Sequence, residues 1–182
     1  LLRISRAVVK AVDTQIWNIL TESQSAVDIN SVAITAGNEW DSATIANRDP
    51  IQNILDAIKE IQEENYNALG GNGHLVLNPK DYANLLGNAN VRNAGQFYTA
   101  EVTSNGRVGR MLGLKIIVSN TVTADNAAVI IANEAGTWKE AAALRTETII
   151  EPGISYKIRA WEIGVCQLTN PKAVCLISNT AG

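Results

Sequence analysis

The chain has 182 residues, a formal net charge of -3 at pH 7, 46% hydrophobic residues and 18% charged residues. This hydrophobic content excludes a disordered chain. The slightly acidic charge gives no basic footprint for sequence-specific nucleic-acid binding, and only incidental contact with nucleic acid stays open. No apolar run approaches the roughly 20 residues that a membrane-spanning helix needs. The length suits one domain or two small ones.

Apolar residues at three- and four-residue steps predict a long helix over residues 2–23. Its apolar members are Ile4, Val8, Ala11, Val12, Ile16, Ile19 and Leu20. We place Val8 on the buried face of this helix. At 1.5 Å per residue the helix would span roughly 33 Å, so it is either an ordinary core helix or a spine that supports a flat, extended domain.

A strand-like piece and a polar loop over residues 26–47 lead to the clearest helix of the sequence, over residues 50–69. Asp49 can cap this helix, Pro50 fits its first turn, and Gly70-Gly71 can end it. A short strand over residues 74–77 follows. Asn78-Pro79 then begins a third helix, which we expect to run to Leu86.

Residues 87–106 are polar and rich in Asn, which predicts a long loop. Loops of this length in compact domains are usually functional or disordered. From residue 107 onward strands dominate. Residues 114–118 and 127–132 are short apolar runs typical of buried central strands.

The last third of the chain predicts a long hairpin. Residues 141–150 alternate between apolar and polar, Glu151-Pro152-Gly153 suits a type II turn, and the return strand covers residues 154–168. The apolar parity of the return strand switches by one residue, which predicts a bulge or a twist near residues 160–162.

Reactive side chains are few. His74 is the only histidine, and Cys166 and Cys175 both lie in apolar strand-like runs, where buried free thiols are the ordinary outcome. One histidine and two scattered cysteines supply neither a nucleophilic triad nor a zinc site. We therefore predict a structural protein and no enzyme, with no cofactor and no metal.

The order of these elements resembles the major capsid proteins of tailed phages, whose fold is named for the coat of the Hong Kong ninety-seven phage and is shared by encapsulins. The residues that carry the resemblance are the long first helix, Leu75-Val76-Leu77-Asn78-Pro79 before a helix, Leu112-Gly113-Leu114-Lys115-Ile116-Ile117-Val118-Ser119, and the closing Asn170-Pro171-Lys172-Ala173-Val174-Cys175-Leu176-Ile177. The similarity spans nearly the whole chain, through short motifs.

The resemblance implies an α+β fold in two parts. Residues 1–26 and 139–167 would form a peripheral domain of spine helix and long hairpin. Residues 27–138 and 168–182 would form an axial domain, a mixed sheet flanked by helices. The candidate positions that set the spine and the hairpin turn are Val8, Pro152 and Gly153.

The resemblance also implies that the loop 87–106 points toward a five- or six-fold axis, where neighbouring subunits meet. Its candidate contact residues are Asn88, Asn90, Arg92, Asn93, Gln96 and Tyr98. The family's N-terminal arm and extended loop precede the spine helix and are absent here. We therefore expect this chain to fold but to assemble poorly, as monomers or loose small oligomers.

In function, the resemblance implies a subunit that self-assembles through pentamers and hexamers into an icosahedral shell around double-stranded DNA. The implied partners are other copies of the chain, the packaged DNA, a scaffold, a maturation protease and a portal, without a membrane. The implied location is the capsid of the virion, assembled in the host cytoplasm. Two alternatives stay open: an encapsulin-like compartment that holds cargo, and a ligand-binding or enzymatic α+β domain with a deep apolar pocket.

Overall fold

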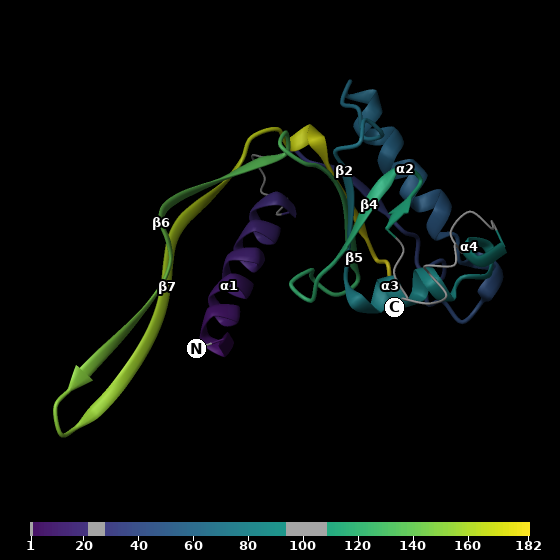
Figure 1. Ribbon diagram of the computed structural model, residues 1–182. Coiled ribbons are helices and arrows are strands. Elements are labelled where there is room, and N and C mark those ends of the chain that lie inside the picture. Colours follow the sequence, from purple (N-terminus) through teal and green to yellow (C-terminus); the bar gives the residue numbers. More distant parts are fainter. Residues whose placement is uncertain (1, 22–27, 94–108) are drawn as a thin grey trace.

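The computed structural model describes residues 2–21, 28–93 and 109–182, in which a compact sheet domain carries a long hairpin and a helix on one side (Figure 1). The helices are α1 (Leu2–Thr21), α2 (Pro50–Glu63), α3 (Pro79–Gly87) and α4 (Ala89–Asn93), with 3-10 turns at Ile45–Asn47 and Pro171–Ala173. The strands are β1 (Asn30–Ala33), β2 (Gly73–Leu77), β3 (Arg110–Met111), β4 (Leu114–Val118), β5 (Asn126–Ile131), β6 (Gly136–Glu151), β7 (Ser155–Leu168) and β8 (Val174–Ser178).

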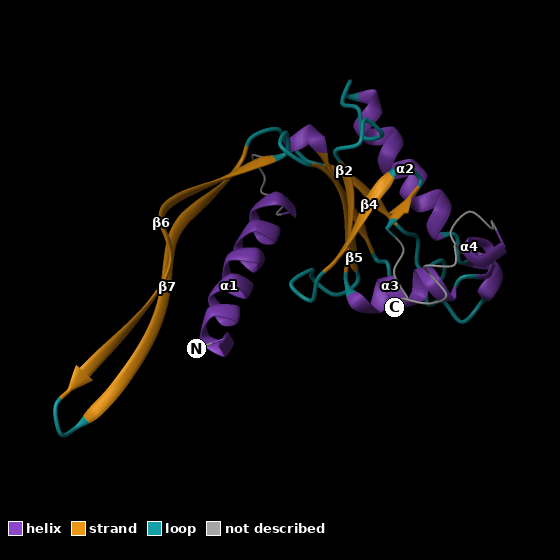
Figure 2. Ribbon diagram, in the orientation of Figure 1, coloured by secondary structure: helices purple, strands orange, loops and turns teal. Residues whose placement is uncertain are grey.

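Six strands form one mixed sheet in the order β1-β8-β5-β2-β4-β3. The β1–β8 and β2–β4 pairs are parallel and the other pairs are antiparallel. The remaining strands, β6 and β7, form a separate two-stranded sheet (Figure 2). The predicted α+β class with a mixed sheet and a long hairpin is therefore confirmed.

Side-chain parity divides the sheet into two faces. On β2 and β5, Leu75, Leu77 and Val129 point into the main core together with Ile54 and Ile61 of α2. Ala128 of β5 and Val76 of β2 point to the opposite face, where Trp17 of α1 packs. The α2 face is closed, because its largest core side chains have almost no exposed surface.

Helix α2 begins as predicted and ends earlier. The Asp49 side chain accepts a hydrogen bond from the Gln52 amide at 3.1 Å, with Pro50 in the first turn. The prediction that the helix runs to residue 69 is wrong, because Asn65 adopts φ = 64° just after Glu63. The amides of Asn65 and Tyr66 bond back to Gln62 and Ile61, which closes the helix end as a glycine would.

Helix α1 lies on the opposite face and is less deeply buried. Its Trp17 is 5% exposed, and the indole Nε1 donates to Thr123 Oγ1 at 2.9 Å. Val8 is half-buried, so it lies on the less exposed side of the helix without being part of a closed core. One turn of α1 anchors the helix to the sheet, and the N-terminal half is more open.

The hairpin extends away from the sheet domain, and its tip projects past the N-terminal end of α1 (Figure 1). With 16 residues, β6 spans roughly 50 Å. The predicted turn is confirmed: Gly153 has φ = 77°, and the Ile154 amide bonds to the Glu151 carbonyl at 3.0 Å. The predicted irregularity also exists, but its extra residues lie on β6, between Glu140 and Arg145, opposite residues 161–164 of β7.

Two further predictions need correction. The segment after Gly87 is not loop from its start, because α4 occupies Ala89–Asn93. Strand β4 is not a central buried strand, because it lies next to the edge strand β3 and leaves Ile117 45% exposed. The apolar run of β5 is buried in the sheet as expected.

Candidate functional site

The side chains that could carry chemistry are occupied in the fold. His74 Nδ1 lies 2.8 Å from the Asn72 carbonyl oxygen. Cys166 and Cys175 are free and buried, and burial raises the pKa of both thiols, that of Cys175 to about 12. A thiol with such a pKa is protonated at neutral pH and is a poor nucleophile.

Metal and membrane sites can be assessed over the described ranges. There, no group of three or more His, Cys, Asp or Glu side chains is placed to hold a metal ion. No helix in those ranges is long and apolar enough to cross a bilayer. The surfaces of the molecule are therefore the place to look for a functional site.

The outer half of the hairpin has two chemically different faces. Residues that pair directly across an antiparallel ladder lie on the same face of the sheet. Ile150 pairs with Tyr156 and Thr148 pairs with Ile158. Together with Ile154 of the turn, these residues define what we call the apolar hairpin face.

The other face of the same segment carries charge pairs. Lys157 Nζ lies 2.8 Å from Glu151 Oε1, and Arg159 Nη2 lies 2.7 Å from Glu147 Oε2. The Lys157 ammonium and the Ser155 hydroxyl lower the pKa of Glu151. These exposed pairs contribute little to stability because water screens them, but they suit a face that stays in water.

The apolar hairpin face is strongly exposed in the single chain. Ile154 is 83% exposed, Tyr156 79% and Ile150 58%. No third strand in the described ranges covers these side chains, since β6 and β7 pair only with each other. Exposed apolar patches of this kind mark sites of protein–protein contact.

Close to the sheet domain the hairpin is packed and stiff. The Trp138 indole of β6 lies directly over Gly164 of β7, where any Cβ atom would collide with the ring. Leu20 of α1 similarly fills the space beside Gly136. These contacts fix the base of the hairpin, so that the apolar hairpin face is presented by a rigid support.

The sequence revealed this hairpin but not its role as a surface. The alternation of Ile154, Tyr156 and Ile158 was evident in the strand pattern. Alternation alone predicts a strand with one covered face and does not say what covers it.

The candidate contact loop is placed only in part. Asn88 is 6% exposed, its Nδ2 donates to the Arg48 carbonyl, and its Oδ1 accepts from the Asn90 amide at 2.8 Å. This side chain therefore serves the fold and is not available for contact with a neighbour. Asn90 is exposed, and α4 also contains Arg92 and Asn93. Gln96 and Tyr98 lie outside the described residues.

An unusual carboxylate lies at the other end of the sheet domain. Asp81, in the first turn of α3, is 1% exposed, and neither of its oxygens has a hydrogen-bond partner among the described residues. Burial raises the pKa of Asp81 to about 6. The surrounding charges are Lys80, Asp41 and Asp125, and Lys80 bonds to the two other carboxylates at 3.1 and 3.8 Å.

Comparison with known proteins gives the fold a family. A family model described as phage capsid protein matches residues 1–177. No curated protein sequence matches the chain. The match covers α1, the sheet domain and the hairpin together, which is the whole architecture described above.

Solved structures share this fold at low sequence identity. A chain of Mycobacterium phage Che8 has a TM-score of 0.72 at 19% identity, over 98% of this chain and 61% of the phage chain. The capsid of cyanophage P-SCSP1u gives 0.71 at 12% identity, over 97% and 64%. An encapsulin from Synechococcus elongatus gives 0.57 at 9% identity, over 98% and 64%.

These chains are longer than this one, which spans 61–64% of their length. At such identities they establish the common fold and nothing finer, and among these three the encapsulin has the lowest TM-score. The assignment of this chain to a family rests on the match to the family model. This chain belongs to the phage capsid protein family.

Proposed function

We propose that the chain is the major capsid subunit of a tailed phage, which self-assembles through pentamers and hexamers into an icosahedral shell around double-stranded DNA. The observation that carries this proposal is the apolar hairpin face, which is rigidly supported and uncovered in the single chain. An exposed apolar patch of this kind marks a site of protein–protein contact, and in a homo-oligomer a neighbouring subunit would cover it.

The hairpin supports contact between copies of this chain. A closed shell needs the same surface of every subunit to meet a neighbour, so the contact surface has to be part of each chain's own fold. The apolar hairpin face meets that condition, because β6 and β7 form a stiff ladder up to the turn at Gly153. The charged side of the hairpin, with Lys157 and Arg159, would remain in water.

The division of labour between the two parts of the chain belongs to this proposal. Residues 1–26 and 139–167 would act as the peripheral domain, and residues 27–138 and 168–182 as the axial domain. Neighbouring axial domains would meet through the segment that contains Asn90, Arg92, Asn93, Gln96 and Tyr98. A scaffold, a maturation protease and a portal would be partners during assembly in the host cytoplasm, and the mature subunit would reside in the capsid of the virion.

The test is negative-stain electron microscopy of the full-length gene product. Closed icosahedral particles are expected from the wild type. The variant Ile154→Ser/Tyr156→Ser/Ile158→Ser should remain folded but give few or no closed particles, because the apolar hairpin face is lost.

A matched control keeps the hairpin and changes its other face. Lys157→Gln breaks the exposed ion pair with Glu151, which contributes little to stability, and should assemble like the wild type. Wild-type protein that stays as small discrete particles at every concentration and salt would refute the capsid proposal. A triple variant that assembles normally would remove the apolar hairpin face from it.

A further inference from the structure

The N-terminal half of α1 carries an isolated basic stripe. Arg3, Arg6 and Lys10 are three, then four, residues apart, a spacing that puts them on one side of a helix, and all three are exposed. The first twelve residues contain these three basic side chains and no acidic one, whereas the rest of the chain contains 12 basic and 18 acidic residues. The stripe is therefore a local positive region on an acidic protein.

The basic side chains are not neutralised within the fold. None of the ion pairs found among the described residues involves Arg3, Arg6 or Lys10. The nearest acidic residue along the helix is Asp13, which is also exposed. An uncompensated stripe of this kind attracts a polyanion from solution.

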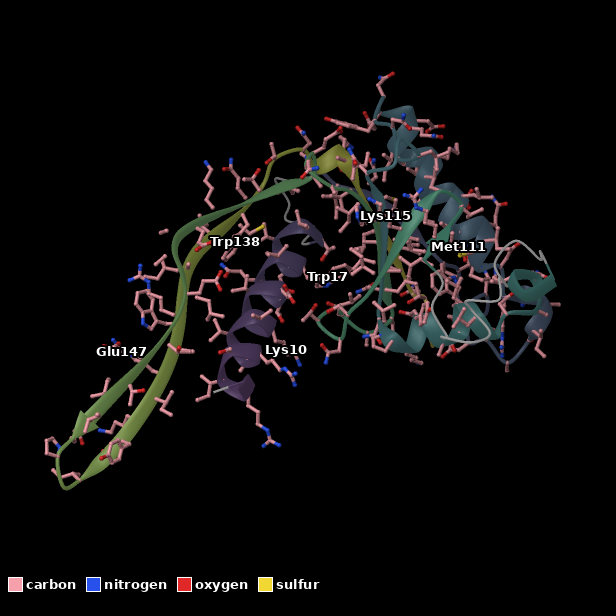
Figure 3. All side chains as sticks on the ribbon, in the orientation of Figure 1. Lys10, Trp17, Met111, Lys115, Trp138 and Glu147 are labelled. Carbon is pink, nitrogen blue, oxygen red and sulfur yellow. The ribbon has the colours of Figure 1, made fainter. Side chains whose placement is uncertain are left out.

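The stripe faces a cleft in the molecule. Arg6 and Lys10 line one wall of an open cleft of about 380 Å³, and the turn Ser119–Thr121, which follows β4, lines the other. Figure 3 shows Lys10 on the side of α1 that faces away from the hairpin. Ser119 Oγ and Thr121 Oγ1 lie 2.7 Å apart, so the far wall offers a hydroxyl pair opposite the two cations.

The chemistry of the cleft fits a phosphate backbone. Arginine, lysine and hydroxyl side chains supply most contacts to nucleic-acid phosphates, and such contacts carry no base preference. Asp13 marks the inner end of the polar region, beyond which the same side of the helix becomes apolar at Trp17. The cleft therefore places Arg6 and Lys10, together with the Asp13 carboxylate, opposite a pair of hydroxyl groups.

We propose that this cleft, lined by Arg6 and Lys10 of α1 and by the turn Ser119–Thr121, with Arg3 next to it on the same side of the helix, is a contact site for the sugar-phosphate backbone of double-stranded DNA. The inference rests on the proposed function, because a capsid subunit meets DNA at high local concentration. A single cleft with three cations binds weakly, and its contribution accumulates when many subunits line the same shell.

The test is salt-dependent binding of a fluorescein-labelled 20-base-pair duplex, measured by anisotropy with unassembled full-length subunits. The cleft variant is Arg3→Gln/Arg6→Gln/Lys10→Gln. The control variant, Lys59→Gln/Lys139→Gln/Arg145→Gln, changes the net charge equally at exposed positions elsewhere. Each phosphate contact contributes about 0.9 to the slope of log K against log salt, so the cleft variant should lose about 2–3 from this slope.

The control variant should retain most of the wild-type slope. Equal losses in the two triple variants would assign the binding to overall charge and overturn the cleft site, as would wild-type protein without salt-dependent binding. Polyglutamate that displaces the duplex at equal charge concentration would indicate an acidic protein segment as the occupant and would equally overturn the proposal.

Electron microscopy of the same variants separates the two levels of inference. If shells form and the cleft variant binds DNA like the wild type, the cleft site is wrong and the capsid function stands. If the wild type forms no shells, the capsid function fails whatever the duplex measurements show.

Discussion

The sheet domain and the hairpin use apolar residues in opposite ways. In the sheet domain, Leu75, Leu77 and Ile54 are almost completely buried against one another. In the hairpin, Ile150, Ile154 and Tyr156 are more than half exposed. The first region buries its own hydrophobic surface and the second leaves it exposed, so under the proposed function stability and assembly would depend on different parts of one chain.

The largest effect should come from opening the core of the sheet domain. Leu75→Ala removes a fully buried side chain from the middle of β2 and should lower the free energy of unfolding by about 2–5 kcal/mol. Chemical denaturation measures this loss. Leu55→Ala on α2, where the side chain is 41% exposed, is the control and should change stability by about 0.5 kcal/mol or less. Similar losses in both variants would contradict a closed core on the α2 face.

The buried carboxylate of Asp81 lowers the stability of the sheet domain when it is ionised. The pKa of Asp81 is raised from 3.8 to about 6, so the folded state favours the protonated carboxyl. The free energy of unfolding therefore falls as the pH rises from about 4 through 6, because the unfolded chain loses this proton first. Asp81→Asn should therefore gain on the order of 2–3 kcal/mol relative to wild type between pH 4 and pH 8. Thermal melting at both pH values measures this difference.

Asp125→Asn is the control for that measurement, because Asp125 is exposed and neighbours the same lysine. Its stability difference from wild type should be nearly the same at the two pH values. A constant difference between Asp81→Asn and wild type would show that Asp81 has the same pKa in the folded and unfolded states.

Helix α1 lies between the two regions, and Val8→Asp tests to which it belongs. Val8 is half-buried, so a charge there should cost about 1–3 kcal/mol and loosen the helix without unfolding the sheet domain. Hydrogen exchange should show faster exchange in α1 and unchanged protection in β2. Val9→Asp, at a 45% exposed position, is the matched control. Loss of the entire fold in Val8→Asp would make α1 part of the cooperative core.

The smallest effect should be confined to the hairpin tip. Gly153→Val forces a β-branched residue to φ = 77° and should weaken the turn by about 1–2 kcal/mol, seen as faster amide exchange near Glu151 and Ser155. Gly153→Asn should behave more like the wild type, because asparagine tolerates positive φ. Equal protection in the valine variant would argue against the type II turn.

Local signals in the sequence predicted the local structure well. Asp49 and Asn78 cap their helices as expected, and Pro152-Gly153 forms the expected turn. The end of α2 was missed because Asn65 adopts the positive φ that usually falls to a glycine at a helix end. An asparagine within a helical pattern does not by itself predict that the helix ends there. Non-local features had no sequence signal: the parallel pairing of β1 with β8 joins segments far apart in the chain, and the burial of Asp81 depends on that assembly.

The non-local features of the candidate site could not be predicted from the sequence either. The sequence predicted the paired strands and their apolar parity but could not show that the outer hairpin lacks a covering element. It also placed the contact loop from Asn88 onward, although Asn88 is itself a helix cap. Apolar alternation reports which face of a strand is hydrophobic, whereas the identity of the group that covers that face depends on the assembled molecule.

Strand β8 has a consequence for biosynthesis. It lies between β1 and β5, so a strand made late in translation completes the middle of the sheet. Until Val174–Ser178 has left the ribosome, β1 has no pairing partner in the sheet and β5 has an open edge. Open edges promote pairing with other chains. The nascent subunit is therefore most vulnerable to aggregation before Val174–Ser178 has been made, and the insertion of this one strand both closes the sheet domain and ends that risk.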